Sequence, residues 1–196
     1  MEFEICKLNE SENTINQAAL ILLESFPEAD TRPDIGRKKA LDTVNECTAD
    51  GNIAAGLKLK SQLIGWAGLR PMYEKTWELH PLAIKPEFQR KGYGRILLNE
   101  LEKIAQGKGI IGIVAGSDDE TNSTSLSEKE ITGENIFEEI KNIRNHRNHP
   151  FEFYKKCGYS IVGVIPNANG QNKPDIWLWK DIRKNNERGL PAPRQI

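Results

Sequence analysis

The spacing of hydrophobic residues predicts five helices along this chain. Over residues 14–26 apolar side chains recur every three or four positions, which predicts an amphipathic helix that Pro27 ends. A short helix is expected to start at Pro150, because proline suits a first helical turn, and Gly158 is a suitable stop. The other helices are expected over 37–47, 96–104 and 135–142.

Strands are predicted where apolar residues alternate with polar ones or form short runs. Residues 52–60 and 62–69 predict a hairpin that turns near Ser61. Further strands are expected at 3–5, 76–84, 110–115, 160–165 and 175–180. Antiparallel pairs come first along the chain, and a strand-helix-strand unit follows. The order therefore predicts an α/β (α+β) fold with a central mixed, mostly antiparallel sheet flanked by helices.

The remaining segments are polar. Residues 28–34 are acidic and contain proline, so we expect an exposed loop. Residues 117–132 are rich in Ser, Thr, Asp and Glu and too long for a tight connection, which predicts a surface loop near function. We expect one domain over residues 1–182, and a charged tail over 183–196 whose composition favours partial disorder.

Composition excludes several classes of function. The net charge of −1 gives no bulk electrostatic attraction to nucleic acid or to an anionic membrane, so neither is expected as a partner. No apolar run approaches the roughly 20 residues of a membrane span, and the N-terminus lacks a signal-peptide pattern. The three cysteines are an odd count without metal-like spacing, which predicts reduced, structural thiols in a cytoplasmic protein.

A glycine-containing loop carries the first functional signal. It joins the strand expected at 76–84 to the helix expected at 96–104. Glycines there let backbone N–H groups point outward, and the helix N-terminus adds unpaired N–H groups and a positive dipole end. This arrangement predicts a phosphate or pyrophosphate site. The loop residues are Gln89, Arg90, Lys91, Gly92, Tyr93 and Gly94, with Arg95 adding positive charge.

Two other glycine-loop families fit less well. A dinucleotide-binding fingerprint needs three glycines after a first strand, whereas this loop has two glycines and lies mid-chain. A P-loop needs Lys-Ser or Lys-Thr after its second glycine, and Arg95 follows here.

QRKGYG at 89–94 resembles the phosphate-binding signature of the GCN5-related N-acetyltransferases (GNAT). FEFYKKCGY at 151–159 is similar to the aromatic stretch near the end of that fold. The resemblance covers roughly residues 2–180 and implies the GNAT fold, with the loop holding the pyrophosphate of acetyl-CoA.

Five separated motifs, in order, resemble the aminoglycoside 6′-N-acetyltransferases within that superfamily. They are WELHPL at 77–82, GSDD at 116–119, HPFEFY at 149–154, GVIPNANG at 163–170 and KPDI at 173–176. The resemblance implies acetyl transfer from acetyl-CoA to the 6′-amine of an aminoglycoside, and so antibiotic resistance. It also implies a homodimer with the C-terminal strands at the interface.

The resemblance implies catalytic roles for four residues. Glu78 is the first candidate for the general base, directly or through a water, and His80 is a second base or a substrate-placing group. An even spacing predicts that Glu78 and Leu82 share a strand face. The Leu82 amide would polarise the thioester carbonyl. The pantetheine arm would pair along Leu82, Ala83 and Ile84 at a β-bulge. Tyr154 would protonate the thiolate of coenzyme A.

An aminoglycoside carries several positive charges, so its site should be acidic. Asp118, Asp119 and Asp175, with Glu78 and His80, are the expected substrate contacts. Each of these side chains also has a plain structural interpretation: a solvated loop or strand carboxylate, or a packed histidine. The same holds for Tyr154 as a packing aromatic and for the four tryptophans, which suit either sugar stacking or a core.

Other interpretations stay open at this point. The same fold could acetylate another amine, such as a polyamine or a protein amino group, or bind acyl-CoA without catalysis. The His-containing stretch 144–149 lacks the acids or cysteines of a metal site, so no metal is expected.

Overall fold

The computed structural model describes residues 3–26 and 33–183 of the chain. It divides into two compact units, Met1–Ile111 with Ile182–Ile196, and Gly112–Asp181, here called the N-terminal and C-terminal units. Most of the loop expected at 28–34 and nearly all of the tail expected at 183–196 lie outside the described residues. A single domain over 1–182 therefore stays a prediction.

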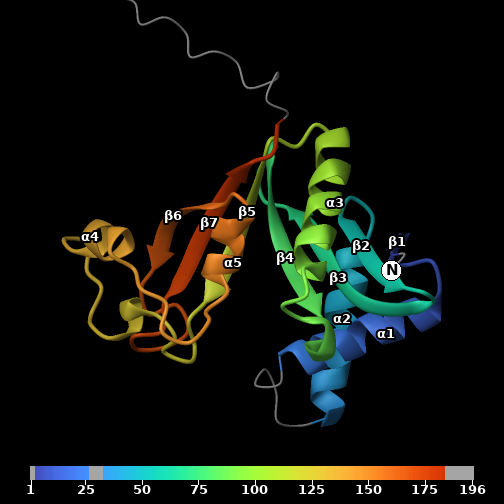
Figure 1. Ribbon diagram of the computed structural model, residues 1–196, viewed down its shortest axis with the longest axis horizontal. Helices are drawn as coiled ribbons and strands as arrows, with labels where there is room; N and C mark the ends of the chain where they lie inside the picture. The colour runs from blue at the N-terminus through green and yellow to red at the C-terminus, as the bar shows by residue number, and fades with distance from the viewer. Residues whose placement is uncertain (1–2, 27–32, 184–196) are drawn as a thin grey trace, which may run out of the picture. The chain divides into compact units, whose positions relative to one another are not determined.

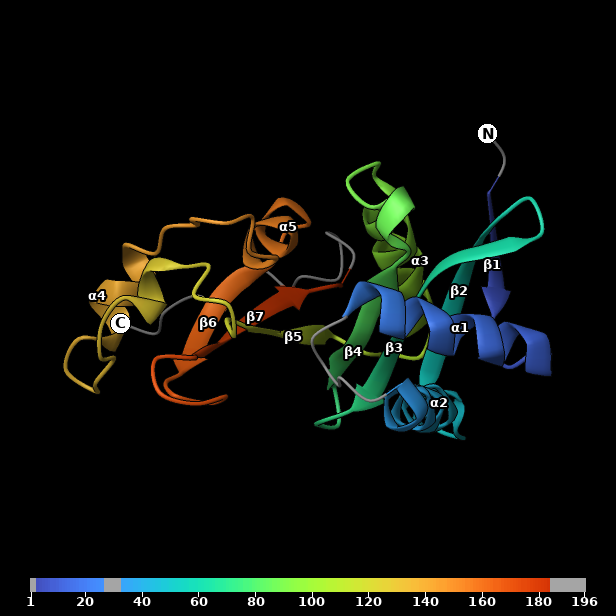
Figure 2. The same cartoon turned by 90° about the horizontal axis from the view of Figure 1, so that it is seen from below.

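The N-terminal unit is a four-stranded sheet with helices on both faces. All neighbouring strands in it are antiparallel. Figures 1 and 2 show α1 and α2 on one face and α3 on the other. The strands are β1 (Phe3–Lys7), β2 (Ile53–Leu59), β3 (Gln62–Pro71) and β4 (Thr76–Ile84), and the helices are α1 (Glu12–Ser25), α2 (Pro33–Thr48) and α3 (Tyr93–Gly107).

The core of this unit explains why α1 lies where it does. Ser11 caps the helix, since its side chain accepts a hydrogen bond from the backbone N–H of Thr14 at 3.1 Å. The apolar face of α1 packs on the sheet, where the Trp66 indole donates a 2.9 Å hydrogen bond to the Ala18 carbonyl. Trp66 is fully buried, so it is a core residue and does not stack on a sugar.

A β-bulge interrupts the pairing of β3 with β4. Ala67 pairs with Leu82 and Leu69 pairs with Leu79, so the single residue Gly68 faces two residues, His80 and Pro81. A Cβ at Gly68 would lie 2.6 Å from the His80 carbonyl oxygen, which only glycine avoids. The His80–Pro81 peptide bond is cis. The bulge expected in this strand is therefore present, directly before Leu82.

The C-terminal unit is a three-stranded antiparallel sheet in the order β5-β7-β6. Two short helices and a 3-10 turn accompany it (Figure 1). Gly158, with φ 92°, follows α5 closely, as its sequence position predicted. The strands are β5 (Gly112–Asp118), β6 (Ser160–Ile165) and β7 (Asp175–Asp181), and the helices are α4 (Ile136–Lys141) and α5 (Phe151–Lys156).

The expected fold class, α/β with mostly antiparallel pairing and flanking helices, is confirmed. The strand predicted at 110–115 instead runs from Gly112 to Asp118. Its start is later because the N–H of Ile110 bonds to the Ala105 carbonyl and so closes the end of α3. Among the described residues, no helix is both long and apolar enough to cross a bilayer.

Candidate active site

The loop after β4 has the geometry of an anion cradle. Gly92 caps α3 with φ 90°, a left-handed conformation that side-chain-bearing residues rarely adopt. A Cβ there would meet nothing within 4 Å, so backbone conformation and not space demands glycine. The Gln89 side-chain amide donates a 2.9 Å hydrogen bond to the Ile84 carbonyl and ties the loop to the end of β4.

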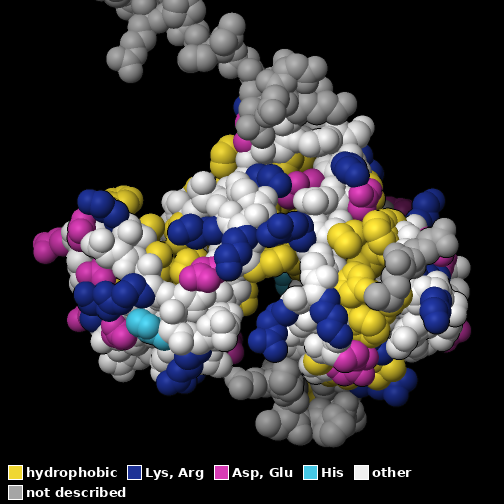
Figure 3. Space-filling model, viewed as in Figure 1, with side chains coloured by type: hydrophobic (Ala, Val, Ile, Leu, Met, Phe, Trp, Pro, Cys, Tyr) yellow, Lys and Arg dark blue, Asp and Glu magenta, His cyan; other side chains and the backbone are white. Residues whose placement is uncertain are grey.

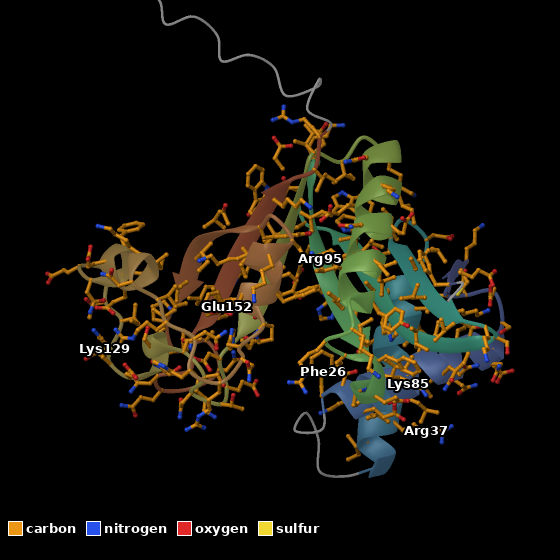
Figure 4. The ribbon with its side chains drawn as sticks, in the orientation of Figure 1. Phe26, Arg37, Lys85, Arg95, Lys129 and Glu152 are labelled. Carbon is orange, nitrogen blue, oxygen red and sulfur yellow. The ribbon has the colours of Figure 1, made fainter. Side chains whose placement is uncertain are left out.

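Positive charge surrounds this helix N-terminus. Arg90, Lys91 and Arg95 are exposed, and the first turn of α3 holds no acidic residue. Figure 4 labels Arg95 near the start of α3, and Figure 3 shows dark blue side chains beside this end of the helix. The Lys91 ammonium also lies 5.8 Å from the centre of the Phe88 ring. Backbone N–H groups and three cations fit the diphosphate of a nucleotide cofactor.

The bulge changes which β4 side chains share a face. Glu78 pairs with Arg70, whereas Leu82 pairs with Ala67, and these two β3 residues point to opposite faces. The expectation that Glu78 and Leu82 share a face is therefore wrong, because the bulge adds one residue between them. Glu78 and His80 are two residues apart on β4, with Leu79 between them, so these two side chains still share a face of the strand.

Glu78 is held by an arginine that sequence reasoning missed. Arg70 Nε donates to Glu78 Oε2 at 2.8 Å and Nη2 donates to Oε1 at 3.2 Å. The third guanidinium nitrogen, Nη1, donates to Glu46 Oε1 on α2 at 3.1 Å. Only the β3–β4 register reveals this pair, since the two residues are eight apart in sequence and nothing local couples them.

His80 is suited to accept a proton. Burial lowers its pKa below the usual 6.5, and the positive charge of Arg70 lowers it further, while Glu78 and Glu46 oppose the shift. The imidazole is therefore neutral at pH 7. Beneath it, the Cys47 thiol donates to the His80 carbonyl at 3.1 Å, and burial raises the pKa of that thiol to about 11.

Asp118 and Asp175 are cross-strand partners at one end of β5 and β7. Asp118 is exposed and accepts a hydrogen bond from the Asn169 side chain. Asp175 is partly buried: its Oδ1 accepts from the Ser117 N–H at 2.9 Å and its Oδ2 from the Trp177 indole at 2.6 Å. Two of the predicted acidic residues thus come together, with Asp118 the more accessible carboxylate.

Asp119 has no exposed surface. Its carboxylate accepts hydrogen bonds from the Ser123 N–H, the Thr124 N–H and hydroxyl, and the Ser127 hydroxyl, at 2.6 to 2.9 Å. Burial disfavours the charge, but the bonds from Ser127, Ser123 and Thr124 outweigh it and hold the pKa of Asp119 below 3.8. This geometry gives Asp119 the role of organising the loop after β5, and offers no direct contact with a ligand.

The loop at 117–132 is consequently more ordered than its composition suggested. Residues 123–127 are all buried. The Ser125 N–H bonds to the Arg144 carbonyl and the His146 N–H bonds to the Ser123 carbonyl, which fastens the loop to the segment before α5. The expectation of a surface loop is wrong for this central part, because Asp119 and these backbone bonds replace the missing apolar residues.

His149 connects the Asp118 turn to α5. Its Nε2 lies 3.0 Å from the Asp118 carbonyl oxygen, and its Nδ1 accepts from the Phe151 N–H at 3.3 Å. The Asn145 side chain fixes the His149 backbone with two more hydrogen bonds. The sequence signal was a histidine in a matched motif, which gave no hint of this bridging position.

Tyr154 is buried in an aromatic cluster. Its ring centre lies 5.2 Å from that of Phe153 and 5.7 Å from that of Tyr159. Burial, with a smaller effect of Cys157, raises the pKa of Tyr154 above the usual 10. The phenol is therefore protonated at neutral pH and keeps its O–H donor.

Comparison with known proteins identifies the family. The model of the acetyltransferase (GNAT) family matches residues 16–129, more than half of the chain. The chain belongs to the acetyltransferase (GNAT) family. It is accordingly an acetyltransferase, with acetyl-CoA as co-substrate. In the comparison with curated proteins, nothing matched the sequence.

Three solved structures are similar to this GNAT protein over nearly its whole length. An aminoglycoside 6′-N-acetyltransferase complexed with coenzyme A is 34% identical, covers 94% of this chain and 98% of its own, and superposes with a TM-score of 0.84. The aminoglycoside 6′-N-acetyltransferase from Enterococcus faecium is also 34% identical, with the same coverage of both chains and a TM-score of 0.83. An aminoglycoside 6′-acetyltransferase type Ii is 31% identical, covers 94% of this chain and 99% of its own, and has a TM-score of 0.70.

The anion cradle fits the pyrophosphate of the co-substrate of this family. A left-handed glycine cap, open space around it and three exposed cations are what a diphosphate requires. Within residues 3–26 and 33–183, no group of His, Cys, Asp or Glu side chains is arranged to hold a metal ion.

Proposed function

We propose that this acetyltransferase transfers the acetyl group of acetyl-CoA to the 6′-amino group of aminoglycoside antibiotics and thereby confers resistance. The observation that carries the proposal is the 34% identity to two aminoglycoside 6′-N-acetyltransferases over 94% of the chain. The five sequence motifs that resemble these enzymes support it, because they include Glu78, His80, Asp118 and Tyr154.

The N-terminal unit would hold the co-substrate. The cradle at 89–95 binds the pyrophosphate, with Gln89 fixing the loop and Arg90, Lys91 and Arg95 offsetting the negative charge. The pantetheine arm pairs with β4 along Leu82, Ala83 and Ile84, on the edge of the strand away from β3, because β3 already pairs with these three residues on the other edge. In this arrangement the Leu82 N–H donates to the thioester carbonyl oxygen, where negative charge develops, an effect worth roughly 10²–10³-fold in rate.

Glu78 and His80 would accept a proton from the ammonium group of the acceptor, and the neutral amine that results is the nucleophile. A carboxylate has about four acceptor positions, so Glu78 can receive a proton or a water while Arg70 occupies two of them. His80 is neutral at pH 7 and can accept a proton as well. Asp118 and Asp175 supply further negative charge for a polycationic acceptor, and Asp119 contributes by holding the loop that follows them.

Tyr154 would assist the departure of the coenzyme A sulfur. A phenol whose pKa lies above 10 is a weaker acid than a thiol of pKa about 8.5. Complete proton transfer from Tyr154 to the sulfur is therefore uphill. The raised pKa instead favours a hydrogen bond from the phenol to the developing thiolate, a weaker form of the expected general-acid role.

The test is a thiol-release assay on the purified full chain with acetyl-CoA and kanamycin or tobramycin. We expect release of coenzyme A that depends on the antibiotic, and a product acetylated at the 6′ nitrogen by NMR. Spermidine and a peptide amine are the comparison acceptors. Release with one of these and none with aminoglycosides would replace the proposed substrate, and acetyl-CoA binding without release for any amine would indicate a non-catalytic sensor.

The cellular setting of this activity is part of the proposal. We expect a cytoplasmic homodimer with its C-terminal strands at the interface, as the resemblance implies. Sedimentation at several concentrations measures the oligomeric state, and a mass equal to one chain throughout would contradict a dimer.

A further inference from the structure

Four ionisable side chains of the N-terminal unit form one cluster that family motifs describe only in part. Glu78 and His80 lie on β4, Arg70 lies on β3, and Glu46 lies on α2. Arg70 is the central member, since it bonds to both glutamates. Its positive charge also reaches His80, whose pKa it lowers. The cluster therefore joins three elements around the candidate bases.

The contacts of Arg70 restrict Glu78 strongly. Nε and Nη2 bind the two carboxylate oxygens side by side, a two-point contact that fixes both the position and the plane of the carboxylate. Nη1 binds Glu46 Oε1, so the guanidinium is itself anchored from α2. Glu78 is the less exposed glutamate, with 24% of its side chain accessible against 57% for Glu46.

The register explains why Arg70 can do this. Arg70 is the direct cross-strand partner of Glu78, and the bulge begins two residues further along β4. The pair thus sits on the last regular stretch of the ladder before the backbone is displaced. A side chain at this point needs a fixed partner if its carboxylate is to keep one orientation beside an irregular strand.

We propose that Arg70 is a positioning residue, which holds the Glu78 carboxylate in the orientation used toward the acceptor amine, with Glu46 as its anchor. The inference rests on the proposed function only in that Glu78 acts on an acceptor amine. Arg70 itself contacts neither acetyl-CoA nor the acceptor in this proposal. Because its effect on the rate passes through Glu78, substitutions of Arg70 and Glu78 should not have additive effects.

The test is a double-mutant cycle with Arg70→Gln, Glu78→Gln and the double variant, measured by thiol release. We expect Arg70→Gln to lower kcat about tenfold with a smaller change in KM, since small misplacement of a reacting group is costly. In the Glu78→Gln background the same substitution should change nothing. Arg70→Lys should restore only part of kcat, because an ammonium cannot bind both oxygens in one plane.

Two controls separate positioning from stability. Lys58→Gln removes another ion pair of the same unit, which Lys58 of β2 forms with Glu10 in the connection between β1 and α1, and should leave kcat unchanged. Glu46→Gln should lower kcat in the same direction as Arg70→Gln but less. Thermal unfolding of every variant shows whether lost activity follows lost folding, which would assign Arg70 a structural role and overturn the proposal.

The outcomes distinguish this inference from the proposed function. If aminoglycosides are not acetylated but another amine is, the proposed function fails and the cycle is run with that amine. If the wild-type chain is active and Arg70→Gln has the same effect with and without Glu78, or no effect, only the positioning role fails. If no amine is acetylated, both fail.

Discussion

At the residue scale, two side chains of β4 are candidates for the base, and their surroundings differ. Glu78 accepts hydrogen bonds from Arg70 at both carboxylate oxygens. His80 lies in a partly buried position that keeps its ring neutral at pH 7. One residue therefore depends on a partner for its orientation, and the other depends on burial for its protonation state. Substitution and pH measure these two dependences separately.

Glu78→Gln keeps the size of the side chain and removes its basicity. If Glu78 is the general base, kcat should fall by roughly 10²–10⁴-fold, the usual contribution of such a group. Glu4→Gln, at an exposed position of β1, serves as the matched control and should leave the rate unchanged. A near-normal rate for Glu78→Gln would remove Glu78 from the mechanism.

The pKa of His80 predicts a pH effect with a definite sign. Because that pKa is lowered, the folded chain binds fewer protons than the unfolded chain just below pH 6.5, so stability contributed by this group is lost as pH falls through that region. If His80 is the base, kcat/KM should also fall there. Replacement by Gln should remove this acid limb, and a limb that persists would assign it to another group.

At the element scale, the bulge between β3 and β4 depends on Gly68. The His80 carbonyl and the Cys47 side chain occupy the space that a Cβ at Gly68 would need. The loop after β5 depends in a similar way on one residue, Asp119, which accepts four hydrogen bonds. The missing side chain of Gly68 therefore sets the shape of the bulge, and the carboxylate of Asp119 sets the shape of the loop after β5.

Gly68→Ala should displace the bulge. The added Cβ would lie 2.6 Å from the His80 oxygen, and we expect a loss of about 1–3 kcal/mol in unfolding free energy together with lower kcat/KM. Gly107→Ala, in α3, is the control because a Cβ there meets nothing within 4 Å. Denaturant unfolding measures the difference, and equal stability of the two variants would contradict the account of the bulge.

Asp119→Asn should destabilise the C-terminal unit, because an amide nitrogen would face groups that now donate to a carboxylate. Leaving such buried groups unsatisfied costs about 1–3 kcal/mol. Since the pKa of Asp119 is depressed, its contribution is present above pH 3.8 and is lost as pH falls through the lower folded-state value. Asp50→Asn, at an exposed turn, is the control. A pH-independent difference between wild type and Asp119→Asn would count against this role.

At the scale of the whole molecule, a net charge of −1 coexists with local surfaces of both signs. Cations gather at the start of α3, whereas carboxylates meet at the end of β5 and β7. An anionic co-substrate and a cationic acceptor can therefore be recognised by a nearly neutral chain.

Acetyl-CoA should stabilise the whole chain without an acceptor. A ligand that binds only the folded state adds about 2.7 kcal/mol at a concentration 100 times its Kd. For a chain of this size, each kcal/mol of added stability raises Tm by roughly 2–4 °C. Differential scanning fluorimetry checks the shift, which Arg90→Gln combined with Lys91→Gln should reduce. An unchanged Tm at millimolar acetyl-CoA would contradict the cradle.

The sequence by itself determined the helices, the strands and the family, because these depend on local periodicity and on motifs read in order. It also placed Glu78 and Leu82 on a strand, Tyr154 on a short helix and the cradle at the start of a helix, although α3 begins earlier than expected, at Tyr93. Spacing alone assigned Glu78 and Leu82 to one strand face, and composition alone assigned residues 117–132 to the surface. The first assignment assumes regular strand alternation, which the bulge interrupts. The second assumes that a polar segment is exposed, whereas the hydrogen bonds of Asp119 bury part of this one.

Only the tertiary structure decided those points. A bulge exists in relation to a second strand, so the faces of Glu78 and Leu82 follow from the pairing of β3 with β4. Arg70 meets Glu78 for the same reason. Asp119 is buried because backbone N–H groups and hydroxyls four to eight residues away close around it, which no pattern of polar letters reveals. Pairing and burial depend on contacts between separate segments, and these form only when the chain is folded.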